Sequence, residues 1–314
     1  MKIAYLGPAG TFTEEALLSD PASQGPDVEL VPMPSIDEVL ASVDVGQVDR
    51  GFVAIENSIE GTVNVTLDTL IFGSELLIQR EVVTPIRMHL MGRDGADIAG
   101  IQRVLSFPHA IAQCRDWLTR HAPGAAIVAA NSTADAVRMV SEGDDPTAAA
   151  IGPARAGELH GLQVLAEDIE DHPDNATRFV LVARDGIPPP TGHDKTSIVC
   201  FQRADHPGSL HSILGQFSAR DLNLTKLESR PTKKGLGDYC FVIDLEGHVD
   251  DEVIADCLRD LHAQLPAVKF LGSYPAAGSH GESRRRDAET SWREADEWVR
   301  SLKAKVGRGF WQSY

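Results

Sequence analysis

The sequence is short of basic side chains, and this shortage excludes one large class of proteins. Its 314 residues carry 29 Lys and Arg against 46 Asp and Glu, a formal net charge of -17. A nucleic-acid-binding surface needs the opposite balance, because its Lys and Arg release counterions from the phosphates. The same imbalance means that an anionic substrate must be held by a local positive field against the global negative one.

The sequence also has few cysteines and no long apolar run. The cysteines are scattered, without a Cys-x-x-Cys pair or a nearby pair of histidines: Cys114, Cys200, Cys240 and Cys257. This spacing indicates reduced thiols rather than a metal site. No apolar run approaches the ~20 residues of a membrane-spanning helix. The chain opens directly on a strand-like segment, residues 3–6, so we expect no signal peptide and a soluble cytoplasmic protein.

What is present in residues 1–186 is an alternation of strand-like and helix-like segments. Thr11 and Glu14 have the spacing of a capping box, which predicts a helix directly after the first strand. A second predicted strand, residues 51–55, leads into Glu56, Asn57 and Ser58. This repeated order predicts a mostly parallel sheet with helices on both of its faces.

Two further segments predict that the first part of the chain forms two lobes. Residues 76–83 and 87–91 have the composition of strands that cross to a second lobe, and residues 179–183 that of a returning strand. We therefore expect one lobe of residues 1–80 with 165–186, and another of residues 81–164. Crossing strands of this kind would leave a hinged cleft between the lobes.

Short polar side chains follow several of the predicted strands and are candidates for that cleft. Each lies where a helix N-terminus offers N–H donors and the positive end of its dipole. Together they could hold a carboxylate-bearing molecule with few Lys or Arg, and the alternative for each is a simple helix cap. The candidates are Thr11, Thr13, Asn57, Ser58, Ser106, Ser132 and Thr133.

The segment from Asn175 to Phe179 stands where an acidic loop, residues 167–174, becomes an apolar strand. Thr177, Arg178 and Phe179 place a hydroxyl, a guanidinium and an aromatic ring at the mouth of that strand. Polar groups on such a rigid support suit a small-molecule site. The alternative is an ordinary loop-to-strand junction, and strand alternation also allows Arg178 to face away from Thr177.

A proline-rich linker, residues 187–194, precedes a different pattern. The predicted order after it is strand, helix, strand, strand, helix, strand over residues 195–274, which is typical of a ferredoxin-like unit. Such a unit exposes sheet edges, so a regulatory or assembly role is the natural expectation. In the tail, residues 275–314, helical spacing predicts an amphipathic helix through Trp292, Ala295, Val299 and Leu302.

Several of these motifs together resemble prephenate dehydratases that carry a C-terminal ACT regulatory domain. The matching stretches are Gly7–Thr13, Glu56–Ser58 with Gly61–Val63, Asn175–Phe179 and Leu224–Pro231. The resemblance covers roughly residues 1–274 in the right order. It implies an α/β fold with a two-lobed, periplasmic-binding-protein-like catalytic domain and a ferredoxin-like βαββαβ ACT domain.

The resemblance implies the loss of water and carbon dioxide from prephenate, which gives phenylpyruvate for phenylalanine biosynthesis. No cofactor is implied, because formation of the aromatic ring drives the reaction. Thr177 is implied as the essential catalytic residue that assists the departing hydroxyl, and Arg178 and Glu56 are further catalytic candidates. The candidates for substrate binding are Thr11, Asn57, Ser58, Ser106, Asn175 and Phe179.

The resemblance also implies regulation by phenylalanine, bound at a subunit interface of a homodimer or homotetramer. The implied effector residues are Gly208, Ser209, Leu210, Asn223, Glu228, Ser229 and Arg230. The chain departs from the family pattern at Phe107, where a His is usual, and at His211, where a Val is usual. A histidine acid is therefore missing at position 107, and the identity of the effector stays open. Arogenate dehydratase and a non-catalytic sensor of a small ligand are the alternative functions.

Overall fold

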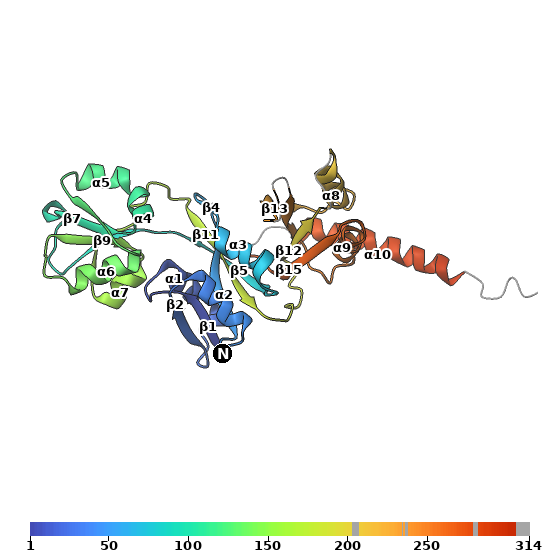
Figure 1. Ribbon diagram of the computed structural model, residues 1–314, viewed down its shortest axis with the longest axis horizontal. Coiled ribbons are helices and arrows are strands. Elements are labelled where there is room, and N and C mark those ends of the chain that lie inside the picture. Colours follow the sequence, from blue (N-terminus) through green and yellow to red (C-terminus); the bar gives the residue numbers. More distant parts are fainter. Residues whose placement is uncertain (203–206, 234, 236–237, 279–281, 306–314) are drawn as a thin grey trace, which may run out of the picture. The chain divides into compact units, whose positions relative to one another are not determined.

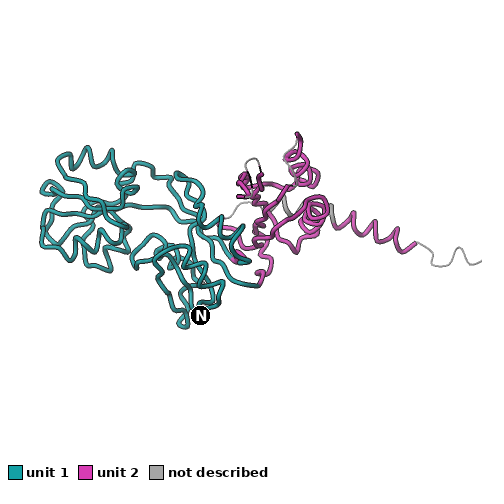
Figure 2. Tube along the Cα trace, viewed as in Figure 1, with its two compact units in different colours: residues 1–76, 80–185 teal, residues 77–79, 186–314 magenta. Residues whose placement is uncertain are grey.

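The computed structural model describes residues 1–202, 207–233, 235, 238–278 and 282–305, with only the backbone described at 22 and 282–292. The chain forms two compact units (Figure 2). Unit 1 comprises Met1–Leu76 and Arg80–Asp185, and unit 2 comprises Leu77–Gln79 and Gly186–Tyr314. Among the described residues, no helix has the length and apolar character that crossing a membrane requires.

The sheet of the first lobe contains both the first strand of unit 1, β1, and its last strand, β11 (Figure 1). Its elements are β1 (Lys2–Leu6), α1 (Phe12–Ser19), β2 (Glu29–Met33), α2 (Ile36–Asp44), β3 (Arg50–Asn57), β4 (Gly61–Thr62), α3 (Asn64–Asp68), β5 (Leu77–Pro85) and β11 (Ala176–Ala183), with a 3-10 turn at Pro21–Ser23 and a π-helical turn at Thr69–Gly73. The strand order is β2-β1-β3-β11-β5, and β4 pairs with β3.

The second lobe of unit 1 has its own sheet, in the order β10-β6-β9-β7-β8. Its elements are β6 (His89–Gly92), a 3-10 turn (Ile98–Gly100), β7 (Arg103–Ser106), α4 (Pro108–Ala112), α5 (Arg115–His121), β8 (Ala126–Ala129), α6 (Thr133–Glu142), β9 (Ala148–Gly152), α7 (Ala154–His160) and β10 (Gln163–Ala166). The α/β fold with two lobes is therefore as predicted.

The prediction of mostly parallel sheets needs correction, because both sheets are mixed. β1 runs parallel to β2 and β3, and β7 runs parallel to β8 and β9. In contrast, β11 runs antiparallel to β3, and β6 runs antiparallel to β9 and β10. Two strands joined by a helical crossover within one sheet run parallel. β6 and β11 instead follow segments that cross from one lobe to the other, so their direction is not restricted in this way.

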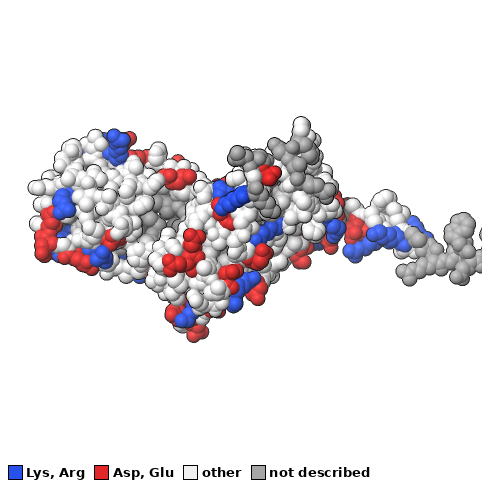
Figure 3. Space-filling model, in the orientation of Figure 1, with Lys and Arg blue, Asp and Glu red and all other residues white. Residues whose placement is uncertain are grey.

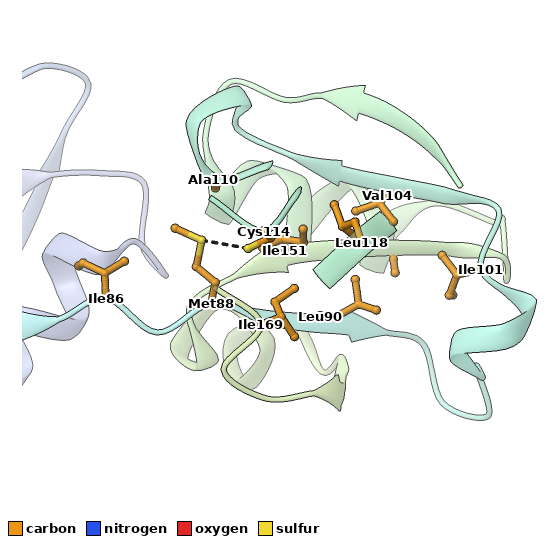
Figure 4. Packing of buried hydrophobic residues seen from close by; sticks show 11 residues of the cluster. Ile86, Met88, Leu90, Ile101, Val104, Ala110, Cys114, Leu118, Ile151 and Ile169 are labelled. Carbon is orange, nitrogen blue, oxygen red and sulfur yellow. Dashed lines mark hydrogen bonds between the residues drawn. The ribbon is translucent and has the colours of Figure 1, made fainter. Parts of the chain in front are cut away.

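Each lobe has its own apolar core. In the first lobe, buried Ile3, Tyr5, Leu17, Phe52 and Phe179 pack together. The core of the second lobe, drawn in Figure 4, packs Leu90 and Val104 of two strands against residues of the following helices and loops. Within it the thiol of Cys114 lies 3.5 Å from the sulfur of Met88.

Unit 2 has the predicted ferredoxin-like order. Its elements are β12 (Asp194–Phe201), α8 (Ser209–Ser218), β13 (Leu224–Pro231), β14 (Tyr239–Glu246), α9 (Glu252–Gln264) and β15 (Ala267–Pro275). The sheet order is β13-β14-β12-β15, and all three pairings are antiparallel. A helix, α10, follows at Glu282–Ala304; of its described side chains, Trp298 is 63% exposed. The side chain of Trp292 lies outside the described residues.

Candidate active site

Thr177 lies inside strand β11 and not in the loop before it. The strand begins at Ala176, because the backbone there is already held by Ser58: the N–H of Ser58 donates to the carbonyl of Ala176 (2.9 Å), and the N–H of Ala176 donates to the Ser58 hydroxyl (3.0 Å). Thr177 stands opposite Asn57 of β3 in the sheet register. Its side chain is buried, with 8% of the residue exposed.

The side-chain amide of Asn57 has a fixed orientation. Its Oδ1 accepts the backbone N–H groups of Ile59 (2.9 Å) and Glu60 (3.0 Å), which can only donate. Its Nδ2 therefore faces the other way and donates to Oγ1 of Thr177 at 2.9 Å. Because the Thr177 oxygen accepts this bond, its own hydroxyl proton remains available to donate to a bound molecule.

Asn175 continues this network into the second lobe. Its Oδ1 accepts from Nδ2 of Asn57 (2.8 Å) and lies 3.4 Å from the Ser58 hydroxyl. Its Nδ2 donates to Oε1 of Gln113 at 2.9 Å. Asn175 is only 2% exposed, and a buried amide left without partners would be costly, so these contacts fix its position. The structure thus brings the predicted residues Asn57, Ser58, Asn175 and Thr177 together.

Gln113 is the member of the network that the sequence reasoning missed. Gln113 is the C-cap residue of α4, and the next helix, α5, begins at Arg115. From Pro108 to Leu118 the sequence pattern predicts one continuous helix, and within such a helix Gln113 has no reason to stand out. The only signal was a polar side chain beside the buried Cys114 of an otherwise apolar segment.

Arg178 and Glu56 are brought together by an ion pair. Nη1 of Arg178 lies 3.6 Å from Oε2 of Glu56, and Nε of Arg178 donates to Oε2 of Glu81 on β5 at 2.7 Å. The side chain of Arg178 is 11% exposed and that of Glu81 1%. Arg178 therefore lies between carboxylates from both strands that flank β11. Glu81 was not among the predicted residues.

Three other predicted residues use their side chains for packing or hydrogen bonds within their own lobe. Phe179 is 2% exposed and stacks on Phe52, with ring centroids 5.2 Å apart, so it belongs to the core and not to the wall of a cleft. Thr11 caps α1 by accepting the N–H of Glu14 at 3.3 Å. Ser106 is fully buried and donates to the carbonyl of Ile151 at 2.7 Å.

The segment that departs from the family pattern presents an aromatic ring where the histidine is usual. Phe107 is 40% exposed, and its ring lies 5.6 Å from that of His109, nearly parallel to it. Nδ1 of His109 lies 3.4 Å from a carboxylate oxygen of Glu60, in the turn after β3. Position 107 therefore offers no proton donor, and His109 contacts the first lobe through Glu60.

Helix α1 of the first lobe meets α7 of the second through two carboxylates. Glu14 accepts the Gly10 N–H (2.6 Å) and the Tyr5 hydroxyl (3.2 Å), and lies 3.8 Å from Nε of Arg155. Burial, together with the charge of Glu14, raises the pKa of Tyr5. Burial likewise raises the pKa of Glu15, although a hydrogen bond from the Arg155 backbone opposes this rise.

In unit 2, the predicted effector residues lie at the start of α8 and on β13, an edge strand of the sheet. Gly208 precedes α8 with φ of +89°, a left-handed conformation that favours glycine. On β13, the carboxylate of Glu228 lies 3.3 Å from Nζ of Lys226 and 3.5 Å from Nη1 of Arg230. Asn223, just before β13, accepts the N–H of Glu246 with its carbonyl at 3.0 Å.

The distribution of charged side chains bears on which ligands the two units could hold. In the part of the chain that the structure describes, no group of three or more His, Cys, Asp or Glu side chains is placed to hold a metal ion. On the face drawn in Figure 3, Lys and Arg are interspersed with Asp and Glu over both units. An anionic ligand would therefore depend on individual donors in its site.

Comparison with known proteins identifies two family models in the chain. The model of the prephenate dehydratase family matches residues 3–187, and that of the ACT domain matches residues 196–263. The prephenate dehydratase of Mycolicibacterium smegmatis is 41% identical over 303 residues, which cover 93% of this chain and 96% of the relative.

Solved structures of the same fold agree. Prephenate dehydratase from Arthrobacter aurescens, crystallised in complex with L-Phe, is 42% identical with a TM-score of 0.87, over 97% of this chain and 100% of that one. A protein described as a quorum-quenching acylase, GqqA, is 29% identical with a TM-score of 0.78, over 88% of this chain and 98% of that one. The fold alone therefore does not determine the reaction.

Proposed function

The chain belongs to the prephenate dehydratase family, and we propose that it dehydrates and decarboxylates prephenate at Thr177. The hydrogen bond from Nδ2 of Asn57 to Oγ1 of Thr177 carries this proposal. It occupies the threonine oxygen as an acceptor and leaves the hydroxyl proton to be donated. A donor aimed at the departing hydroxyl is what the reaction requires of the protein.

The proposed step balances without a cofactor. The ring carboxylate of prephenate leaves as carbon dioxide, and the electron pair of the broken C–C bond enters the ring. The C–O bond to the ring hydroxyl breaks with its own electron pair, and the oxygen leaves as water after taking up a proton. A threonine hydroxyl is a weak acid, so Thr177 stabilises the charge that develops on the leaving oxygen by a hydrogen bond, and solvent supplies the proton in the end.

Asn57, Ser58, Asn175 and Gln113 are proposed to hold this donor in place. Their hydrogen bonds to one another support this role better than direct binding of a carboxylate, because the donors of Asn57 and Asn175 already face neighbouring side chains. Asn57→Ala and Ser58→Ala separate the two roles. Loss of positioning lowers kcat, whereas removal of an interaction made equally with the ground and transition states raises KM.

We assign catalysis to residues 1–186 and regulation to residues 195–274. Phenylalanine is the proposed effector, supported by the L-Phe in the Arthrobacter relative. Its proposed site uses Gly208, Ser209 and Leu210 at the start of α8, with Asn223 and with Glu228, Ser229 and Arg230 at β13. β13 is an edge strand, which supports a homodimer or homotetramer paired through these units. The four buried free cysteines fit a reducing, cytoplasmic setting.

Turnover of defined substrates tests the proposal. Purified protein is incubated with prephenate, with arogenate and with an acylated homoserine lactone as an acylase substrate, and Thr177→Ala serves as control. We expect phenylpyruvate from prephenate, no comparable turnover of the other two, and inhibition by added phenylalanine. Faster turnover of arogenate would assign the enzyme to that substrate instead, and absence of turnover of both cyclohexadienes would overturn the proposed function.

A further inference from the structure

Glu81 is a buried carboxylate one strand away from the proposed catalytic threonine. Its side chain is 1% exposed and accepts from Nε of Arg178 at 2.7 Å. A carboxylate at this depth is costly unless it is paired and hydrogen-bonded. Arg178, which binds Glu81, directly follows Thr177 in the sequence. A shift of the Arg178 backbone would therefore also move Thr177.

The pairing of β11 with β3 is irregular at this point. Thr177 stands opposite Asn57 and Arg178 opposite Glu56, but Phe179 stands opposite Ala54, so the register shifts directly after Arg178. A slip of one residue turns every side chain of a strand to its other face. Arg178, held by carboxylates from the strands on both sides, opposes such a slip where Thr177 must face Asn57.

We propose that Glu81 is a positioning residue of the dehydratase reaction: it acts through Arg178 to fix Thr177, and strand β5 makes it responsive to the effector-binding unit. The second part rests on the proposed regulation by phenylalanine. The link to the effector-binding unit follows from the path of β5, which spans Leu77–Pro85. The first residues of this strand, Leu77–Gln79, belong to unit 2, whereas Glu81 belongs to unit 1.

Within unit 2, the start of β5 is closely held. Gly272 of β15 has φ of +144°, and a Cβ atom at this position would collide with the backbone carbonyl of Ile78. The side-chain amide of Gln79 donates to the carbonyl of Gly186 at 2.6 Å. Because Ile78 lies against Gly272, a displacement of β15 would be transmitted to the backbone of β5 three residues before Glu81.

A buried polar row crosses the sheet of unit 2 from the proposed effector strand towards β15. Lys226 of β13 stands opposite Asp244 of β14. Asp244 accepts from the hydroxyl of Ser197 on β12 at 2.5 Å, and the same hydroxyl lies 2.6 Å from that of Tyr274 on β15. Ser197, Asp244 and Tyr274 are each at most 3% exposed, so these bonds tie adjacent strands together without competition from water.

The positioning role is tested with Glu81→Gln, which keeps the shape and removes the charge. We expect kcat to fall on the order of 10- to 100-fold with KM little changed, because the change displaces a catalytic group and leaves substrate binding intact. Glu81→Asp should recover part of the activity. Glu29→Gln, which removes a carboxylate from an exposed ion pair with Lys2 on the same sheet, should match the wild type. A Glu81→Gln enzyme that has lower thermal stability but wild-type kcat would overturn the role.

The link to the effector is tested by measuring phenylalanine binding by calorimetry, alone and with a substrate analogue. The ratio of the two dissociation constants is the coupling factor, typically on the order of 5 to 150 in allosteric proteins. We expect Glu81→Gln and Tyr274→Phe to bind phenylalanine but to bring this factor close to 1. Unchanged coupling in both variants would overturn the link. A wild-type protein that does not bind phenylalanine would instead refute the proposed effector and with it the link, while the kcat of Glu81→Gln would still decide the positioning role.

Discussion

Nδ2 of Asn57 donates a hydrogen bond to Oγ1 of Thr177 across 2.9 Å, from one strand to the next. The direction of this bond follows from the backbone N–H groups of Ile59 and Glu60, which occupy the other end of the amide. An asparagine held in this way can only donate to the threonine, so the threonine hydroxyl keeps its own proton for a hydrogen bond to a bound molecule. The pairing of the two strands thus fixes the direction in which the hydroxyl donates.

Replacement of Thr177 tests the hydroxyl itself. Thr177→Val keeps the β-branched shape and Thr177→Ala removes it, but both lose the donor, so both should lower kcat by ~10²–10³. Thr177→Ser keeps the donor on a less restricted side chain and should retain more activity than either. Steady-state kinetics with prephenate, together with thermal unfolding as a check on the fold, measures the series. A Thr177→Ser enzyme no better than Thr177→Ala would exclude the hydroxyl from the reaction.

The Asn57→Asp substitution tests the direction of the bond. The new carboxylate can only accept, so the hydroxyl of Thr177 would turn to donate to it and would be withdrawn from the substrate. We expect kcat to fall by ~10² or more, comparable to loss of the hydroxyl. Asn64→Asp, which introduces the same charge at the exposed first residue of α3, is the matched control and should have little effect. Equal decreases of kcat in both variants would point to overall charge as the cause.

The strands and the lobes could be predicted from apolar runs and caps, since these are local signals. Ile3–Leu6, the cap at Thr11 and the βαββαβ order after residue 195 all lie where the pattern placed them. The mixed pairing of both sheets could not be predicted, because strand direction depends on where the chain crosses between the lobes. Neither could the ion pair of Arg178 with Glu81, because 97 positions of sequence separate the two residues.

The site shows the same division between local and long-range information. Asn57 and Thr177 could be named as candidates because their short motifs stand at strand ends. Gln113 was missed because its role arises only when the second lobe brings it to Asn175, and Phe179 was placed at the site because its motif includes it. The core explains Phe179 better: alternation along β11 and stacking on Phe52 turn its ring inward.

The cysteines should be unreactive in the native protein. Burial raises the pKa of Cys200 to about 12 and that of Cys257 to about 11, and it also raises the pKa of Cys114. At about pH 8 a thiol with a pKa of about 11 is only ~10⁻³ thiolate, and the thiolate is the reactive form. A chromogenic disulfide reagent should therefore label the folded protein slowly and all four thiols after unfolding in guanidinium. Rapid labelling of the native state would contradict this burial.

Glu15 should make the stability of unit 1 decrease as the pH rises. Burial raises its pKa in the folded state above the unfolded value; the charges of His89 and Arg155 oppose the rise and that of Glu158 adds to it. The folded state therefore binds this proton more tightly. The stabilisation is fully present below the unfolded pKa and is lost as the pH rises through the folded pKa.

Glu15→Gln cannot ionise, and its amide oxygen can still accept the backbone N–H of Arg155. Relative to the wild type, the free energy of unfolding of this variant should rise as the pH is raised from about 4 to about 8. Urea unfolding across this range measures the difference, with Glu29→Gln on the exposed edge of the same lobe as control. If the difference in free energy of unfolding between Glu15→Gln and the wild type stays constant or decreases as the pH rises, the carboxyl does not bind its proton more tightly in the folded state. An increasing advantage would instead identify the contact between α1 and α7 as a place where the fold retains a costly buried charge at neutral pH.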